Sequence, residues 1–114
     1  MNALQLTKAE KKLARQIIEK GLMQEYATGI EKQSKIIEQW KNNQFDNKDA
    51  YLKLYKSLTN YDKHIARRYD RMSGSKYLYI IAELLADKII NLQDINNLTK
   101  TTKDKLLLLS GISK

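Results

Sequence analysis

The chain has 114 residues, which suits one domain able to bury roughly 65% of its unfolded surface in a single core. It contains no Cys, which excludes thiol catalysis, thiolate metal sites and disulfide bonds, and the lack of Pro with only four Gly favours long helices. The net charge of +8 favours anionic partners, although the abundance of Lys, Ile and Asn is also what AT-rich coding DNA produces.

The amino terminus lacks the basic-then-apolar pattern of a secretory signal peptide, because polar and charged residues separate Leu6, Leu13 and Ile17. No segment approaches the roughly 20 apolar residues that a membrane-spanning helix requires. We therefore expect a cytoplasmic protein with no membrane partner.

A long first helix is predicted from about Lys8 to Asn42. Thr7 and Glu10 have the spacing of a capping box, in which the Thr hydroxyl accepts a backbone N–H of the first turn. The apolar stripe of this helix shifts around its axis near Gly21. Either the helix bends there, or its first turns face a different partner such as a second copy of the chain, or those turns fray.

A second helix is predicted from about Lys48 to Met72, after a turn at 42–44 and a cap at Asp46 or Asn47. Because the turn is short, the second helix should run antiparallel to the first. Its apolar residues recur at spacings of three and four, and we predict that the resulting stripe is core. The members of this stripe are Tyr51, Leu54, Leu58, Tyr61, Ile65, Tyr69 and Met72.

The segment from Ser75 to Ile90 is apolar around most of its circumference, which predicts a buried central helix. A final short helix should begin at a cap on Thr101 and end at Ser110 and Gly111. The predicted fold is all-α, as a single domain over residues 1–114. It is a helical bundle of two long antiparallel helices plus a buried third helix and a short C-terminal helical tail.

The tail has the spacing of a helix-turn-helix only in outline. Asn96 stands where that motif has a small residue, and Lys100 stands where its turn has Gly. Leu106 alone fits the third marker position, the hydrophobic anchor. The alternative is a helical cap on one end of the bundle.

No catalytic residue, cofactor or metal site is predicted. The single histidine, His64, has no Cys partner and no Ser in a nucleophile elbow. The Glu of a di-iron Glu-x-x-His motif would stand at position 61, which is Tyr61.

Basic residues cluster on the second predicted helix. Three of the four Arg of the chain project with the histidine into one arc of about 100°. A guanidinium group binds phosphate or carboxylate through two parallel hydrogen bonds, so the cluster is a candidate anion or nucleic-acid site. Its candidate residues, with two neighbouring lysines, are Lys63, His64, Arg67, Arg68, Arg71 and Lys76. The alternative is that these Arg form salt bridges with Glu31, Glu38 or Glu83 on neighbouring helices.

These patterns favour a non-catalytic interaction or regulatory module that binds through helix faces, either to a second copy as a homodimer or to another protein. The alternative is a nucleic-acid-binding protein that uses the basic patch. No small-molecule substrate is indicated. The choice between the two functions depends on whether the Arg cluster is exposed.

Overall fold

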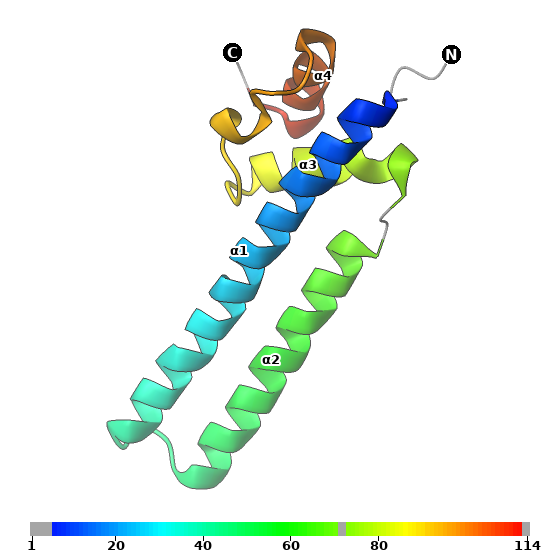
Figure 1. The fold of residues 1–114 in the computed structure, drawn as a ribbon. Helices are drawn as coiled ribbons and strands as arrows, with labels where there is room; N and C mark the ends of the chain where they lie inside the picture. The colour runs from blue at the N-terminus through cyan, green and yellow to red at the C-terminus, as the bar shows by residue number, and fades with distance from the viewer. Residues whose placement is uncertain (1–5, 71–72, 113–114) are drawn as a thin grey trace. The chain divides into compact units, whose positions relative to one another are not determined.

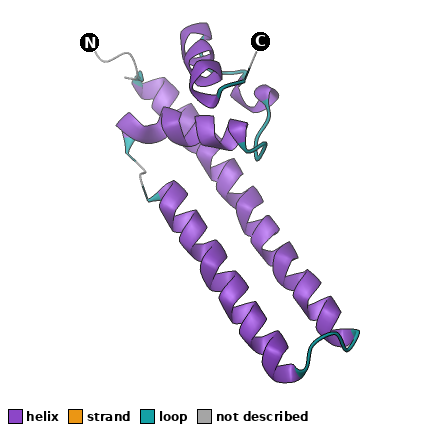
Figure 2. Ribbon diagram, turned by 180° about the vertical axis from the view of Figure 1, so that it is seen from behind, coloured by secondary structure: helices purple, strands orange, loops and turns teal. Residues whose placement is uncertain are grey.

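The computed structural model describes residues 6–70 and 73–112, and its fold is all-α (Figures 1 and 2). The prediction of an all-α helical bundle is thus confirmed, and the described residues form no strand. In chain order the elements are α1 (Lys8–Lys41), α2 (Asn47–Tyr69), the short 3-10 helix η1 (Gly74–Lys76), α3 (Tyr77–Ala86), the 3-10 helix η2 (Leu92–Ile95) and α4 (Lys100–Ser110).

The chain divides into two compact units. The terminal unit comprises residues 1–23 and 71–114, and the hairpin unit comprises residues 24–70. The helix α1 is continuous and contributes to both. A division into compact units does not test whether residues 1–114 fold as one domain, so the single domain stays a prediction.

The helix ends follow from capping side chains. The Thr7 hydroxyl accepts the backbone N–H of Glu10 at 3.1 Å, as the sequence predicts, and the Asp46 carboxylate accepts that of Asp49 at 2.7 Å. Of the two predicted candidates for the cap of α2, Asp46 and Asn47, it is therefore Asp46 that caps the helix. The cap of α4 is Thr99 rather than the predicted Thr101, because the Thr99 hydroxyl accepts the backbone N–H of Thr102 at 3.3 Å. The last helix therefore begins two residues earlier than predicted.

The core of the terminal unit is built around α3, which confirms that the third helix is buried. Seven of its ten residues are buried, and Ile80, Ile81 and Leu84 have no exposed surface. The helix is shorter than the predicted segment 75–90 at both ends. It begins at Tyr77 because η1 occupies the preceding residues, and it ends at Ala86, before Lys88 takes a left-handed backbone conformation with φ of 60°. Two residues of the first half of α1, Ala14 and Ile18, are likewise buried.

The shift of the apolar stripe along α1 is explained by packing inside the terminal unit. The Leu84 side chain lies against Gly21, so closely that a Cβ there would come within 2.6 Å of Leu84 Cδ1. A larger residue at this position of α1 would force the Leu84 side chain to move. The first turns of α1 thus have partners in their own chain, and the shift no longer argues for a second copy on these turns.

In the hairpin unit the second half of α1 and all of α2 run antiparallel, side by side (Figure 1). The seam between them is partly polar: the Gln33 side-chain amide donates to the Ser57 hydroxyl at 2.9 Å. Gly29 lies directly under the Tyr61 ring. The predicted core stripe of α2 is therefore wrong in part, since Tyr51 is 71% exposed and Leu58 56% exposed.

The last member of the predicted α2 stripe, Met72, lies outside the described residues.

Within the described part of the chain, none of the helices combines the length and the apolar character needed to cross a membrane.

Candidate functional site

Of the predicted basic residues, those that the structure describes are not all exposed. Lys63 and Arg67 lie exposed on α2, whereas Arg68 is buried and His64 is partly buried. Arg71 lies outside the described residues. Lys76 belongs to η1 in the terminal unit, where its Nζ lies 5.7 Å from the centre of the Tyr79 ring.

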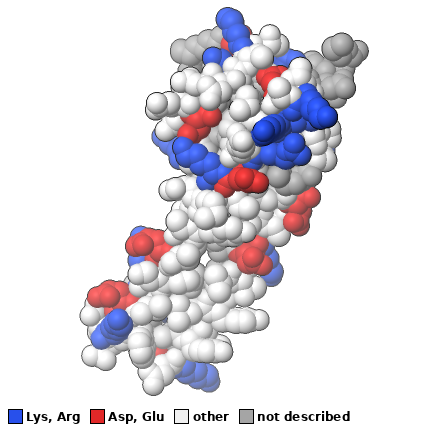
Figure 3. Space-filling view, in the orientation of Figure 1, with Lys and Arg blue, Asp and Glu red and all other residues white. Residues whose placement is uncertain are grey.

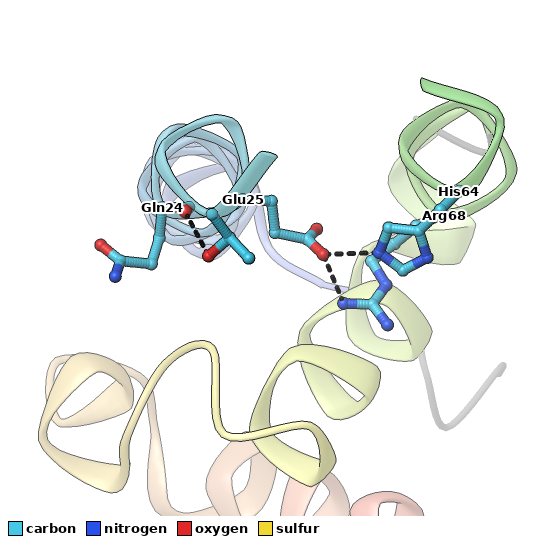
Figure 4. A network of polar contacts seen from close by, with 5 residues as sticks. Gln24, Glu25, His64 and Arg68 are labelled. Carbon is cyan, nitrogen blue, oxygen red and sulfur yellow. Dashed lines mark hydrogen bonds and ion pairs between the residues drawn. The ribbon is translucent and has the colours of Figure 1, made fainter. Parts of the chain in front are cut away.

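Arg68 and His64 are instead joined to an acid of α1 (Figure 4). The Glu25 Oε1 atom lies 2.7 Å from His64 Nε2 and accepts a hydrogen bond from Arg68 Nη1 at 3.1 Å. Glu25 is only 2% exposed. Arg68 is thus paired with Glu25, an acid that was not among the predicted partners Glu31, Glu38 and Glu83. The pairings with those three acids stay predictions.

Two tyrosines lie close to this network. Burial raises the pKa of the Tyr69 hydroxyl well above its usual range, and the neighbouring Glu25 carboxylate raises it further. Burial and the charge of Glu25 also raise the pKa of Tyr61. Both phenols therefore stay protonated and neutral at physiological pH, where they surround the ion pair with weakly polar groups.

The geometry makes this network a tie between α1 and α2. A buried carboxylate is stable only when charged or hydrogen-bonding partners offset its loss of hydration. Glu25 obtains both partners from one turn of α2, at positions four residues apart. A signal in the sequence could have located the acid approximately. Counting equal steps outward from the turn at 42–46 places position 25 level with position 63, next to His64 and just over one turn before Arg68.

A shallow polar groove lies beside the tie on one side of the hairpin. Its lining residues are Thr28, Lys32, Ser57, Asn60, Tyr61 and His64. The Lys32 ammonium lies 5.6 Å from the centre of the Tyr61 ring, which is within cation–π range. The groove on this side of the hairpin is therefore lined by polar residue types.

The other side of the hairpin is apolar and largely in water. We call it the apolar face, and its large side chains are between 38% and 71% exposed. A groove lined by Ile37, Trp40, Tyr51 and Leu54, among others, shows that α1 and α2 contribute to the same side. The exposed members of the face, with Leu52 at its edge by helical projection, are Tyr26, Ile30, Ile37, Trp40, Tyr51, Leu52, Tyr55 and Leu58.

Charge is scarce on this face. Helical projection places Lys48 and Asp62 on the same stripe of α2 as Tyr55, seven residues before it and seven after it. No charged residue of α2 lies between these two on that stripe. Figure 3 shows a broad uncharged surface over the α1/α2 hairpin, with charged groups toward its margins.

The tail lacks the two α-helices of a helix-turn-helix in its described residues. The element before α4 is η2, a 3-10 helix of four residues, where the motif needs an α-helix. In the terminal unit, α4 packs on α3. The tail therefore fits the alternative of a helical cap better than it fits the DNA-binding motif.

No protein-family model matches the sequence, no curated protein matches it, and no solved structure matches the chain. Function is therefore inferred from the residues of this chain and from their geometry.

Proposed function

We propose that this chain is a non-catalytic helical interaction module that works through the apolar face of its α1/α2 hairpin. The supporting observation is the exposure of eight large apolar side chains on one side of a two-helix unit. Monomeric soluble proteins rarely keep contiguous apolar surface beyond a few hundred Å² in water. A face of this kind is stabilised when another protein surface covers it.

The composition of the face supports the same function. Four of its members are aromatic, namely Tyr26, Trp40, Tyr51 and Tyr55. Tyr and Trp are enriched at protein interfaces, because a ring contributes a large contact area while the polar tip tolerates water in the free state. Charged residues, which interface centres avoid, are confined to the ends of the α2 stripe.

Site-specific photo-crosslinking in living cells tests this function without assuming a partner. A benzophenone amino acid is placed at Tyr51 on the apolar face, and in a matched variant at Asn60 on the polar groove. We expect protein adducts from position 51 and few or none from position 60. Equal labelling at both positions, or no protein adduct from position 51, would contradict the proposal.

Nucleic-acid binding is the second candidate function. It no longer rests on the predicted Arg cluster, since Arg68 is held by Glu25. Its support is the distribution of charge: the terminal unit carries 12 Lys and Arg against 6 Asp and Glu, whereas the hairpin unit carries 9 against 7. The excess positive charge thus belongs mainly to the terminal unit.

A salt series with a labelled DNA duplex tests this candidate. Phosphate contacts release counterions, so log affinity should fall with log salt by about 0.9 per contact. Arg15→Gln and Lys12→Gln, on exposed positions of α1, should each lower that slope by up to about 1, whereas Arg67→Gln on α2 should leave it unchanged. An absence of binding at low salt would remove the candidate.

A further inference from the structure

We propose that the partner on the apolar face is a second copy of this chain, with the two hairpins stacked face to face into a four-helix bundle. The two α2 helices would run antiparallel across a two-fold axis at Tyr55. This inference rests on the proposed function, because it names the partner of the same surface. Three observations support it: the pattern along α2, the register of α1, and the exposed area.

Two pairs of residues on α2 are arranged symmetrically about Tyr55, whereas Tyr51 has Thr59 at the mirrored distance. Lys48 and Asp62 lie seven residues before and after it, and Leu52 and Leu58 lie three residues before and after it. In an antiparallel pair related by a two-fold axis at position 55, each residue faces the one at the mirrored distance. Leu52 would therefore meet Leu58 of the second copy, and Tyr55 would meet its own counterpart.

The charges favour this orientation over a parallel one. Both Lys48 and Asp62 are exposed. The antiparallel arrangement sets the Lys48 ammonium of each copy against the Asp62 carboxylate of the other, and so forms two opposite-charge pairs per dimer. A parallel arrangement would bring lysine to lysine and aspartate to aspartate, which is repulsive.

The same axis also gives α1 a complementary arrangement. The contacts of Gln33 with Ser57 and of Gly29 with Tyr61 fix the register of the hairpin. They place position 35 of α1 at the level of Tyr55. Ile30 and Trp40 lie five residues before and after that position, so Ile30 of one copy would lie opposite Trp40 of the other. Both are apolar residues with a large exposed fraction, 70% for Ile30 and 41% for Trp40.

The area is sufficient for a stable dimer. At about 200 Å² for a large side chain fully in water, the exposed fractions of the eight members add to about 900 Å². An interface of standard size buries about 800 Å² on each partner. Face-to-face stacking would thus bury a normal interface without any change in the hairpin.

Charge reversal tests this arrangement, with sedimentation equilibrium as the measurement. Lys48→Glu alone and Asp62→Lys alone should each weaken dimerisation by about tenfold, because both cross-copy pairs become repulsive. An equimolar mixture of the two variants should dimerise as tightly as the wild type, since both pairs in the mixed dimer are again attractive. The exposed off-face changes Lys56→Glu and Glu31→Lys are the matched controls and should have no effect.

A disulfide test is independent of charge, because the chain contains no Cys. Tyr55→Cys should cross-link to itself on mild oxidation of the full chain, whereas Asn60→Cys should not. No cross-link at position 55, equal cross-linking at both positions, or no rescue in the variant mixture would each overturn the inference.

The two proposals fail in different ways. If the purified chain is monomeric at all concentrations while position 51 labels a different protein in cells, the second copy is excluded and the interaction module stands. If the purified chain is monomeric and position 51 labels no protein, both proposals are overturned.

Discussion

Glu25 on α1 and Arg68 on α2 form a buried ion pair, 3.1 Å from Oε1 to Nη1, across the seam of the hairpin. Both residues are at most 8% exposed, and 43 residues separate them in the chain. The second contact of the same Oε1 atom, to His64, lies one turn earlier on α2. The hairpin is therefore held by charge and hydrogen bonding at this end.

Removal of the Arg68 guanidinium should destabilise the protein strongly. Arg68→Met keeps the aliphatic volume but leaves the Glu25 carboxylate without its cation, at a cost of about 3–5 kcal/mol. Arg67→Met, on the exposed neighbour, should change stability by no more than about 0.5 kcal/mol. Urea unfolding measures both variants. Similar losses in the free energy of unfolding for Arg68→Met and Arg67→Met would show that Arg68 contributes no more to stability than its exposed neighbour.

A methyl group at Gly29 should disrupt the hairpin seam. In Gly29→Ala the new Cβ would lie 2.8 Å from Tyr61 Cδ2, so the ring would have to move away from its contact with α1. We expect a loss of about 1–3 kcal/mol despite a gain in helix propensity of about 1 kcal/mol.

The double variant Gly29→Ala/Tyr61→Leu provides the control for this prediction. It should be more stable than the sum of its single changes implies, because the clash is gone, and thermal unfolding of the four proteins gives this coupling. A stabilised Gly29→Ala would contradict the packing of Tyr61 over Gly29.

Acid should weaken the terminal unit through Glu10. Burial alone raises the pKa of the Glu10 carboxyl, but hydrogen bonds from the Thr102 and Thr99 hydroxyls, at 2.7 and 3.0 Å, outweigh burial and leave the pKa below 4.5. A group whose pKa is lowered by folding stabilises the protein above its unfolded pKa. That stabilisation should be complete above about pH 4.5 and should be lost as the pH falls below it.

Melting temperatures measured from about pH 3 to pH 7 test this prediction. Glu10→Gln should lower stability at neutral pH and flatten the acid limb of the profile. Glu19→Gln, at an exposed position of the same helix, should leave the profile unchanged. An acid limb of wild-type steepness in Glu10→Gln would exclude this carboxylate as a source of the acid sensitivity.

Local signals in the sequence predicted most of the helix ends. Caps act within one turn, so Thr7 and Gly111 could be identified without knowledge of the fold, and the cap of α2 could be narrowed to Asp46 or Asn47. The burial of α3 could also be predicted from the sequence, because a helix that is apolar around most of its circumference has no broad polar side to face water. The cap at Thr99 was missed because Thr99 and Thr101 are both capping residues and only the observed backbone separates them.

The functional surface could not be predicted in the same way. Helical periodicity shows that Tyr51 and Leu58 share a side of α2, but it does not show whether that side meets a helix of the same chain or remains in water. Counting from the turn brings Glu25 only to the approximate level of His64, and its contact with Arg68 depends on the exact register between the two helices. Both features required the packing of α1 against α2.

The fluorescence of Trp40, the single Trp of the chain, tests the role of the apolar face most directly. Trp40 is on the face and 41% exposed in the isolated chain. Acrylamide quenching is measured on purified wild type from roughly 0.1 to 100 µM and on Tyr55→Lys as the association-deficient variant. Quenching of the wild type should fall as concentration rises, while that of Tyr55→Lys should stay at its dilute value. Constant quenching of wild-type Trp40 over the whole range would contradict burial of this face by a second copy.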